Sequence, residues 1–316
     1  MFDYSKEFEL LAQAYEKSGG EITALKNSHI GSLVVSQNKI LGKNEIPGLI
    51  IEGEETPTGA RARITVKQGT VIERPVHLCF GVLPKEGIQE IVAEFHIEDQ
   101  AKATFLAHCS FPNAEKVKHI MDGRIQVGKG ASMTYNETHY HGEQGGVEVL
   151  PVVHVEVDQG GEFRSEFKLS QGTVGQLKMD YEAHLAEKAL CELYAKVYGK
   201  KDDWIQVKES IYLNGARSRG LAKSRIVVRD QAQSEVVGEI IGNGAQSRGH
   251  VDCIEIIQGK GARASAVPRL SVVDETAKLT HEAAIGSVDK KQVETLMARG
   301  LTESEAVEVV VQGLLK

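Results

Sequence analysis

Four cysteines are the residues of this chain best suited to thiolate or metal chemistry, and they stand far apart at Cys79, Cys109, Cys191 and Cys253. No two are close enough in sequence for a C-x-x-C pair, which excludes a zinc ribbon or a ferredoxin-type site. Four scattered cysteines in 316 residues are also unlike a disulfide framework. With charges throughout the first ten residues instead of an apolar leader, the sequence predicts a cytoplasmic protein with reduced thiols.

Cys253 lies in the middle of a segment, residues 250–256, that alternates like a strand. Alternation places Cys253 and Glu255 on one face and Asp252 on the other. One interpretation is that Cys253 is a small residue of the hydrophobic core, because free cysteine is among the most buried residue types. Glu255 on the same face favours a site that uses the thiolate, since an unpaired buried carboxylate is costly.

His281 and Glu282 form a second candidate site shortly before the C-terminus. Adjacent strand residues point to opposite faces, so the two side chains serve either two sites or one site shared by two chains. Thiolate, imidazole and carboxylate together suit iron or zinc. A solvated His-Glu pair is the competing interpretation.

Two further patterns carry weaker indications. His139 and His141 share one face of a strand, which is typical of a metal pair but also of surface histidines. Cys109 follows His108 and precedes Ser-Phe-Pro, which suits either a reactive thiol or a strand-end residue.

The elements that must position these residues follow a period of two along most of the chain, as in residues 123–127, 153–157 and 224–228. Small residues punctuate the strands at 101, 131, 161, 189, 216, 245 and 277, in steps of 27 to 32 residues, with half-turns at 232 and 262. Such a period indicates a repeat architecture. Its strand content favours a parallel β-helix over helical repeats or a propeller, with a β-sandwich of coincidental spacing as the alternative.

Helical patterns appear at both ends. Residues 5–18 predict an amphipathic helix capped by Ser5, with Phe8, Leu11 and Tyr15 on one face. Residues 288–298 and a segment starting at the capping box Thr302-Glu-Ser-Glu predict two more helices. We therefore divide the chain into an N-terminal helix (1–20), a β-helix core (21–285) and a helical segment (286–316), and expect the terminal helices to cover the open edges of the core.

Composition excludes several functions. A net charge of −7 and a pI near 5.9 argue against nucleic-acid binding, and the sequence has no apolar run long enough for a membrane span. A polysaccharide-acting β-helix enzyme needs clustered carboxylates in an aromatic-lined groove, whereas this chain has one Trp.

The C-terminal half resembles the SufB/SufD family of iron–sulfur cluster assembly proteins, most strongly over the last ninety residues and in part from about residue 70. The matching motifs are Ala232-Gln-Ser, Gly238-Glu-Ile-Ile, Gly244-Ala-Gln-Ser, Ala266-Val-Pro-Arg-Leu-Ser-Val, Leu279-Thr-His-Glu-Ala and Arg299-Gly-Leu-Thr-Glu-Ser-Glu-Ala. The resemblance implies an all-β, right-handed parallel β-helix followed by a helical segment, and a scaffold instead of an enzyme.

The resemblance also implies roles for individual residues. Cys253 and Glu282 match the essential Cys and Glu of SufB, and His281 matches a His found in both SufB and SufD, so these three are the expected ligands of a transient Fe–S cluster. Cys109 resembles the sulfur-accepting Cys of SufB, although His108 and Phe111 depart from that motif. By these positions the chain is similar to a short SufB.

The implied partners are the SufC-type ABC ATPase and a sulfur donor. We expect the ATPase to dock on the C-terminal helices through the apolar stripe Val307, Val310 and Leu314. The N-terminal region is short compared with bacterial SufB and lacks its Cys motif, which predicts a homodimer in place of a SufB–SufD pair. The alternative is a structural, SufD-like subunit without a cluster of its own.

Overall fold

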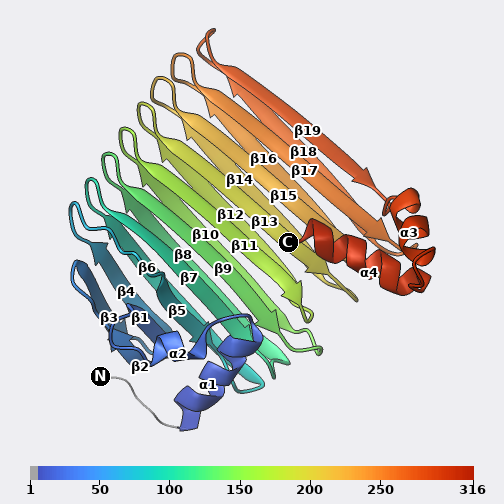
Figure 1. The fold of residues 1–316 in the computed structure, drawn as a ribbon, viewed down its shortest axis with the longest axis horizontal. Helices are drawn as coiled ribbons and strands as arrows, with labels where there is room; N and C mark the ends of the chain where they lie inside the picture. The colour runs from blue at the N-terminus through green and yellow to red at the C-terminus, as the bar shows by residue number, and fades with distance from the viewer. Residues whose placement is uncertain (1–5) are drawn as a thin grey trace.

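Two facing sheets make up most of the protein, which the computed structural model describes over residues 6–316 (Figure 1). The ten-stranded sheet consists, in spatial order, of β19 (Lys278–Gly286), β17 (Arg248–Gln258), β15 (Arg219–Arg229), β13 (Leu190–Gly199), β11 (Glu162–Gln171), β9 (Ser132–His141), β7 (Lys102–Phe111), β5 (Val76–Gly81), β1 (Ser32–Ser36) and β2 (Lys39–Asn44). The nine-stranded sheet consists of β18 (Arg263–Val272), β16 (Gln233–Gly242), β14 (Trp204–Leu213), β12 (Gly175–Leu185), β10 (Val147–Val157), β8 (Lys116–Val127), β6 (Glu86–Ile97), β4 (Gly59–Val66) and β3 (Leu49–Glu55).

From β4 onwards the chain alternates between the sheets, and from β5 onwards each strand pairs in parallel with the strand one turn earlier. This is a parallel β-solenoid of about eight turns, which confirms the predicted β-helix and excludes the sandwich. Within residues 6–316 the antiparallel strand pairs are β1–β2 and β3–β4.

A repeated corner explains the sequence period. At each turn a small residue donates its backbone N–H to the carbonyl three residues earlier, at Ala101, Ala131, Gly161, Ala189, Ser218, Ser247 and Ala277. The residue before it has a positive φ in most turns, as at Gln100 (61°) and Gly130 (62°). Ala216 and Ala245 lie in the predicted turns, and in these two turns the buried Ser218 and Ser247, two residues later, donate the corner hydrogen bond.

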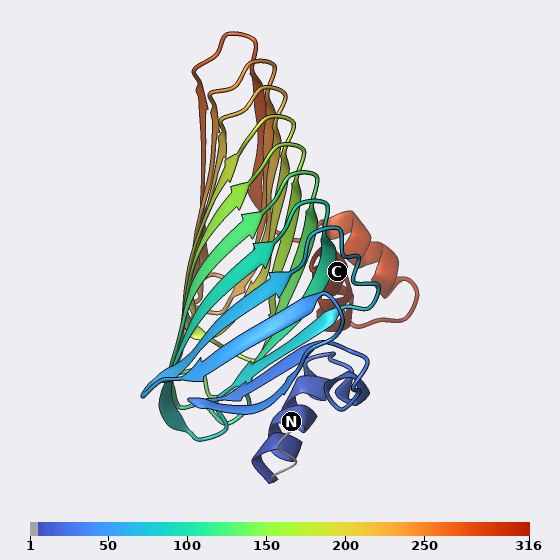
Figure 2. The ribbon, with the colours of Figure 1, turned by 90° about the vertical axis from the view of Figure 1, so that its left-hand side faces the viewer.

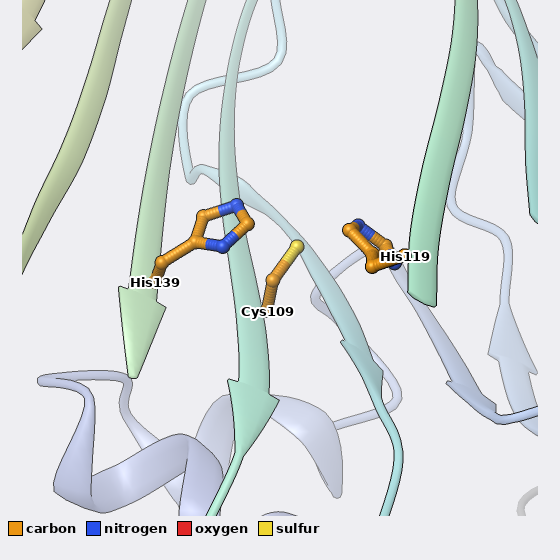
Figure 3. Close-up of side chains that lie close together, drawn as sticks. All are labelled: Cys109, His119 and His139. Atoms are coloured by element: carbon orange, nitrogen blue, oxygen red, sulfur yellow. The ribbon is translucent and has the colours of Figure 1, made fainter. Parts of the chain in front are cut away.

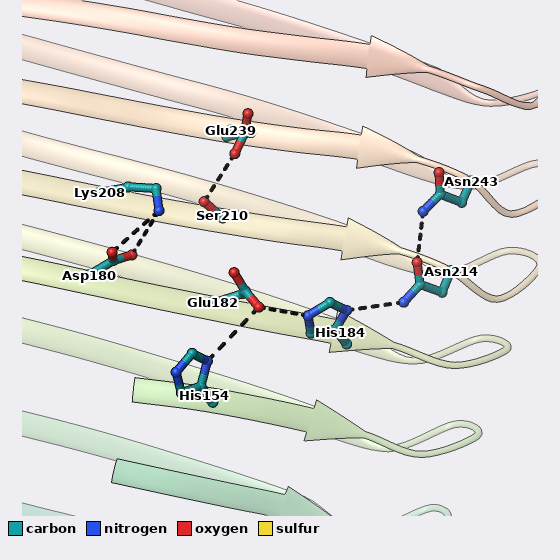
Figure 4. A network of polar contacts seen from close by, with 9 residues as sticks. All are labelled: His154, Asp180, Glu182, His184, Lys208, Ser210, Asn214, Glu239 and Asn243. Atoms are coloured by element: carbon teal, nitrogen blue, oxygen red, sulfur yellow. Dashed lines mark hydrogen bonds and ion pairs between the residues drawn. The ribbon is translucent and has the colours of Figure 1, made fainter. Parts of the chain in front are cut away.

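The core fills the space between the two sheets. Strands from β6 to β16 bury every second residue, so that one apolar cluster runs through the solenoid from Leu33 to Ala262. On the outer faces, polar side chains form ladders between successive turns. Figure 4 shows one of them on the nine-stranded sheet, where Lys208 contacts Asp180 at 3.1 Å and Asn243 donates to Asn214 at 2.8 Å.

The terminal helices pack on the outer face of the ten-stranded sheet, not over its ends (Figure 2). The predicted apolar face of α1 (Lys6–Lys17) is buried against β1, β2 and β5, next to the short α2 (Ile22–Leu25); the predicted cap Ser5 lies outside the described residues. At the other end, α3 (Lys290–Met297) and α4 (Glu303–Leu314) follow β19, and the capping box of Thr302 and Glu305 is confirmed. Among residues 6–316, no helix is both long and apolar enough to cross a lipid bilayer.

The expected covering of the edges by helices was therefore wrong. Strands β18 and β19 end the two sheets with no further strand paired to them in the described chain, and their residues are mostly exposed or half-buried. We call this open end the mouth. Because the interior of a solenoid is closed only by its next turn, the mouth leaves inward-facing positions of the last turn exposed.

Candidate functional site

The parallel register stacks inward side chains of the ten-stranded sheet into rows. One row contains Ala107, Glu137, Phe167, Ala195, Ser224, Cys253 and Ala283. The neighbouring row contains Cys109, His139, Leu169, Val197, Ile226, Glu255 and Ile285. Cys109 on β7 and Cys253 on β17 are thus five strand spacings apart, roughly 24 Å. The structure divides the predicted cysteines between two separate places.

Cys253 is the last inward thiol before the mouth. It lies on β17, 1% exposed, directly above Ser224 and directly below Ala283 of the edge strand. Burial raises the pKa of the thiol to about 11, so Cys253 is protonated at neutral pH until a metal or another cation replaces the proton. One small residue of the last strand separates it from the open end.

His281 and Glu282 lie on the exposed edge strand β19, on opposite faces. His281 stacks on Val251 and therefore shares the inner face with Cys253, whereas Glu282 stacks on Asp252 of the outer face. Asp252 is already engaged by Arg225, whose guanidinium donates to it at 2.6 and 2.9 Å and holds its pKa below the usual range. Within one chain the structure brings His281, but not Glu282, to the face of Cys253.

Two buried carboxyl groups lie in the interior near Cys253. Glu255 is two residues further along the same strand face, and its carboxyl group accepts a hydrogen bond from Ser234 Oγ at 2.5 Å. Burial raises the pKa of Glu255. Glu209 on β14 is 1% exposed, and burial raises its pKa to about 8; one of its oxygens has no hydrogen-bond partner among the described residues. Glu209 therefore keeps its proton at pH values where free carboxyl groups are ionised, and the pKa of Glu255 is shifted in the same direction.

A second constellation lies in the N-terminal half of the solenoid. Cys109 of β7 and His139 of β9 are paired in register, and His119 of β8 approaches them from the opposite sheet (Figure 3). One potential ligand atom from each of the three lies within 4.8 Å of the others. Glu137, two residues before His139, contacts both partners: its Oε1 is 2.6 Å from His139 Nε2 and accepts from Cys109 Sγ at 3.7 Å.

Burial dominates the electrostatics of this constellation, because all four side chains are almost completely inaccessible to solvent. Burial lowers the pKa of His119 and of His139 to about 3 and raises the pKa of Cys109 and of Glu137. Without an added cation, the group therefore holds a neutral thiol, two neutral imidazoles and a carboxyl group that favours its proton.

Sequence reasoning found this constellation only in part. His139 and His141 were predicted as a metal pair or as surface residues, and the surface interpretation is wrong because both are buried. The spacing of Glu137, His139 and His141 places all three on one face, a signal that could have added the glutamate. His119 gave no signal, because it lies on the facing sheet and joins the others only through the tertiary fold.

Cys109 is two residues from the end of β7, as the strand-end interpretation expects. Its role as a sulfur acceptor stays a prediction. The thiol is 0% exposed, so an external sulfur donor would reach it only after a local opening of the solenoid.

The predicted docking stripe on α4 is partly used by the chain itself. Val307 and Leu314 pack against a buried cluster that contains Tyr198 and Val227 of the sheet. Val310 and Leu314 also border a groove of about 500 Å³ between α4 and strands β17 and β19, lined as well by Ile254 and Ile285. ATPase docking on this segment stays a prediction.

Fold and site together define a class of protein: a parallel β-solenoid with buried thiols, one of which lies next to an end where, in the described chain, no further strand is paired. Residues 88–314 match the family model described as "SUF system FeS cluster assembly, SufBD core domain". The chain belongs to the SufBD family of iron–sulfur cluster assembly proteins.

Two relatives are similar to this protein over almost the whole chain. An iron–sulfur cluster assembly SufBD family protein of Methanocaldococcus jannaschii is 40% identical over 283 residues, which cover 90% of this chain and 89% of the relative. A SufBD family protein of Pyrococcus horikoshii is 37% identical over 313 residues, which cover 99% of this chain and 95% of the relative. The iron–sulfur cluster assembly protein SufB of Bacillus subtilis matches over only 70 residues, at 29% identity, covering 22% of this chain and 15% of that protein.

The raised pKa of Glu209 predicts a pH-dependent stability. Between about pH 4.5 and pH 8 the folded state keeps a proton that the unfolded state releases, so rising pH lowers the free energy of unfolding across this window. Below and above the window, Glu209 does not change how the free energy of unfolding depends on pH. Glu209→Gln removes the effect. We expect the stability of the wild type, relative to the variant, to fall by about 1.4 kcal/mol per pH unit inside the window.

Thermal melting of both proteins from pH 5 to pH 8 measures this difference. Glu54→Gln, at an exposed position, is the matched control and should melt in parallel with the wild type. Parallel curves for Glu209→Gln and the wild type would show that the Glu209 carboxyl group is not protonated in the folded state.

Proposed function

We propose that this protein is a scaffold subunit on which nascent Fe–S clusters are built at the mouth of the solenoid, between two copies, in a complex with a SufC-type ATPase. The observation that carries the proposal is the position of Cys253. It is a buried thiol one strand below an unpaired edge, with His281 on the same inner face.

The ligand types suit a cluster that must later be released. A thiolate binds iron strongly, whereas imidazole and carboxylate are more readily exchanged. In this proposal Cys253 anchors the cluster, and His281 and Glu282 supply the exchangeable positions. The iron–sulfur cluster is the cargo of the protein, not a resident cofactor, and ATP hydrolysis belongs to the partner.

A second copy at the mouth is supported by the exposed edges. Strands β18 and β19 offer unpaired backbone groups, and apolar side chains are exposed beside them: Val272 (53%), Val273 (68%) and Ile285 (44%). A two-fold interface would present these residues twice and pair or cover both edges. Because His281 and Glu282 lie on the edge strand itself, they are the site residues nearest to such a partner.

The ATPase is proposed to dock on the C-terminal helices. Helix α4 is anchored to the sheet by Val311, which is buried together with Leu315 against Tyr198 and Val227, so its exposed side faces away from that cluster. Val309 is 49% exposed and Val310 borders the adjacent groove. Because the helices are joined directly to β19, a movement imposed on them would be transmitted to the edge strand that carries His281 and Glu282.

One observation favours the alternative, a structural subunit without its own cluster. Glu282 faces away from Cys253 within one chain, so a single chain does not assemble the three predicted ligands. A SufD-like role would retain the mouth as an interface but would give the thiol no function. Cluster formation by the protein alone separates the two functions.

Replacing Cys253 by Ser should reduce cluster formation at least about tenfold, since it removes the one thiolate of the site. Anaerobic reconstitution with iron and sulfide, followed by visible charge-transfer absorbance and iron content, gives the measurement. Cys79→Ser and Cys191→Ser are matched controls at other buried thiols and should retain the cluster. A cluster of wild-type yield in the Cys253→Ser protein contradicts the scaffold assignment.

Mixed dimers test the shared site. His281→Ala and Cys253→Ser are each expected to be inactive, whereas a mixed dimer regains one intact site if His281 acts across the interface. Coexpression with two different affinity tags isolates the mixed species, and its cluster content should reach about half of the wild-type value. If isolated mixed dimers carry no cluster, both residues serve a site within one chain.

Deleting residues 287–316 should abolish binding of a SufC-type ATPase while the strands remain folded, as checked by circular dichroism. Val310→Glu is a milder variant that keeps α4 anchored and should weaken binding at least about tenfold. Ile88→Glu, at an exposed apolar position on β6, is the control. Unchanged ATPase affinity after both the deletion and the Val310 substitution would place the docking surface elsewhere.

A further inference from the structure

The constellation around Cys109 is separate from the mouth and is not explained by the proposed function. Its four polar side chains are enclosed by the sheets and are almost inaccessible to solvent. Both ring nitrogens of His119 lack a hydrogen-bond partner within residues 6–316, as does Glu137 Oε2. Buried polar groups are normally paired, so an imidazole with two unpartnered nitrogens indicates a missing ligand.

The donor atoms converge on one point. In a tetrahedral zinc site, metal–ligand bonds of about 2.0–2.3 Å place the ligand atoms roughly 3.3–3.6 Å apart. Here the sulfur and the two nitrogens lie within 4.8 Å of one another, and Glu137 Oε1 is 3.7 Å from the sulfur and 2.6 Å from His139 Nε2. Side-chain shifts of about 1 Å would bring one sulfur, two nitrogens and one oxygen to tetrahedral spacing.

Charge and surroundings agree with this geometry. A thiolate and a carboxylate balance the charge of a divalent ion, so that the loaded site is neutral and compatible with burial. His141 Nε2 lies 3.3 Å from His139 Nδ1, in the position of a residue that orients a metal-bound imidazole. The ring of Phe167 stands 4.8 Å from that of His139, and the ring of Phe111 stands 5.1 Å from that of His119; both exclude water.

We propose that Cys109, His119, His139 and Glu137 form a resident site for one divalent transition-metal ion, Zn²⁺ or Fe²⁺, inside the solenoid. The ion takes the place of the protons on the thiol and the carboxyl group. It links β8 of the nine-stranded sheet to β7 and β9 of the ten-stranded sheet, so that it cross-links the two walls in the N-terminal half. While the ion is bound, Cys109 is a ligand and is not free to accept sulfur.

The site is distinct from the cluster cargo. It contains no residue of the mouth, and roughly five strand spacings separate the two. Because a buried site of this kind fills during folding, the ion should copurify with the protein and resist mild chelation. The proposal does not depend on the scaffold function.

Metal analysis of the protein purified without a polyhistidine tag tests the proposal. We expect about one zinc or iron ion per chain, and elemental analysis distinguishes the two metals. After refolding in the presence of Co²⁺, absorbance bands of tetrahedral cobalt–thiolate coordination should appear. Both signals should fall at least about tenfold in Cys109→Ser and in His119→Gln.

His119→Gln is the decisive variant, because His119 makes no hydrogen bond in the described chain that its loss would break. It therefore tests the site even if Cys109→Ser fails to fold. Cys191→Ser, at another buried thiol, and His184→Gln, at a half-buried histidine on β12, are controls that should keep the metal.

Cys253→Ser should also keep the metal while losing the cluster, which separates failure of this proposal from failure of the scaffold function. The proposal is overturned if the wild-type protein binds no metal either as purified or after refolding with Co²⁺. It is equally overturned if His119→Gln and Cys109→Ser bind as much metal as the wild type.

Discussion

The parallel hydrogen-bond register between successive turns is the constraint on which the rest of the structure depends. Each strand is paired with the strand one turn before and one turn after it, so every inward residue is stacked on inward residues of its neighbours. A thiol, an acid or a histidine placed on an inner face is therefore buried by the following turn. This is why Cys109 and Glu209 lie in a dry interior although the chain has few aromatic residues.

In the described chain this stacking ends at the last turn. Nothing in the described chain pairs with the free edges of β18 and β19, and α3 and α4 turn aside to pack on the face of the ten-stranded sheet. Residues that would be core in an earlier turn are exposed here, which gives Cys253 a neighbour that is accessible, His281. The mouth is therefore an exposed end of the fold and the part suited to assembly with another chain.

Two of the interior thiols, Cys109 and Cys253, thus have chemically different surroundings. Around Cys109, histidines and a glutamate from both sheets enclose the sulfur, and the surroundings are closed. Around Cys253, the nearest inward partners are a serine and an alanine, and the carboxyl group of Glu255 is two residues away on the same strand face. The first environment suits an ion that stays, whereas the second suits a cargo that arrives and leaves.

Much of the fold followed from the sequence by itself. The period of two, the small residues at intervals of about thirty and the capping box of Thr302 were enough to predict a β-helix with terminal helices, because each is a local requirement of strands, corners and helix ends. Motifs near Cys253 and His281 were enough to indicate the family. Local patterns, however, do not specify which face of the sheet a helix covers, and the terminal helices were placed at the wrong surfaces.

Only the tertiary structure decided which chemical groups meet. Cys109 and His139 are thirty residues apart and become neighbours through the register, and His119 joins them from the opposite sheet. The separation of Cys109 from Cys253, and of Glu282 from the face of Cys253, likewise depends on strand order and side-chain direction across turns. The physical reason is that strand alternation fixes a side chain's face locally, whereas its partners are set by pairing between distant turns and by the facing sheet.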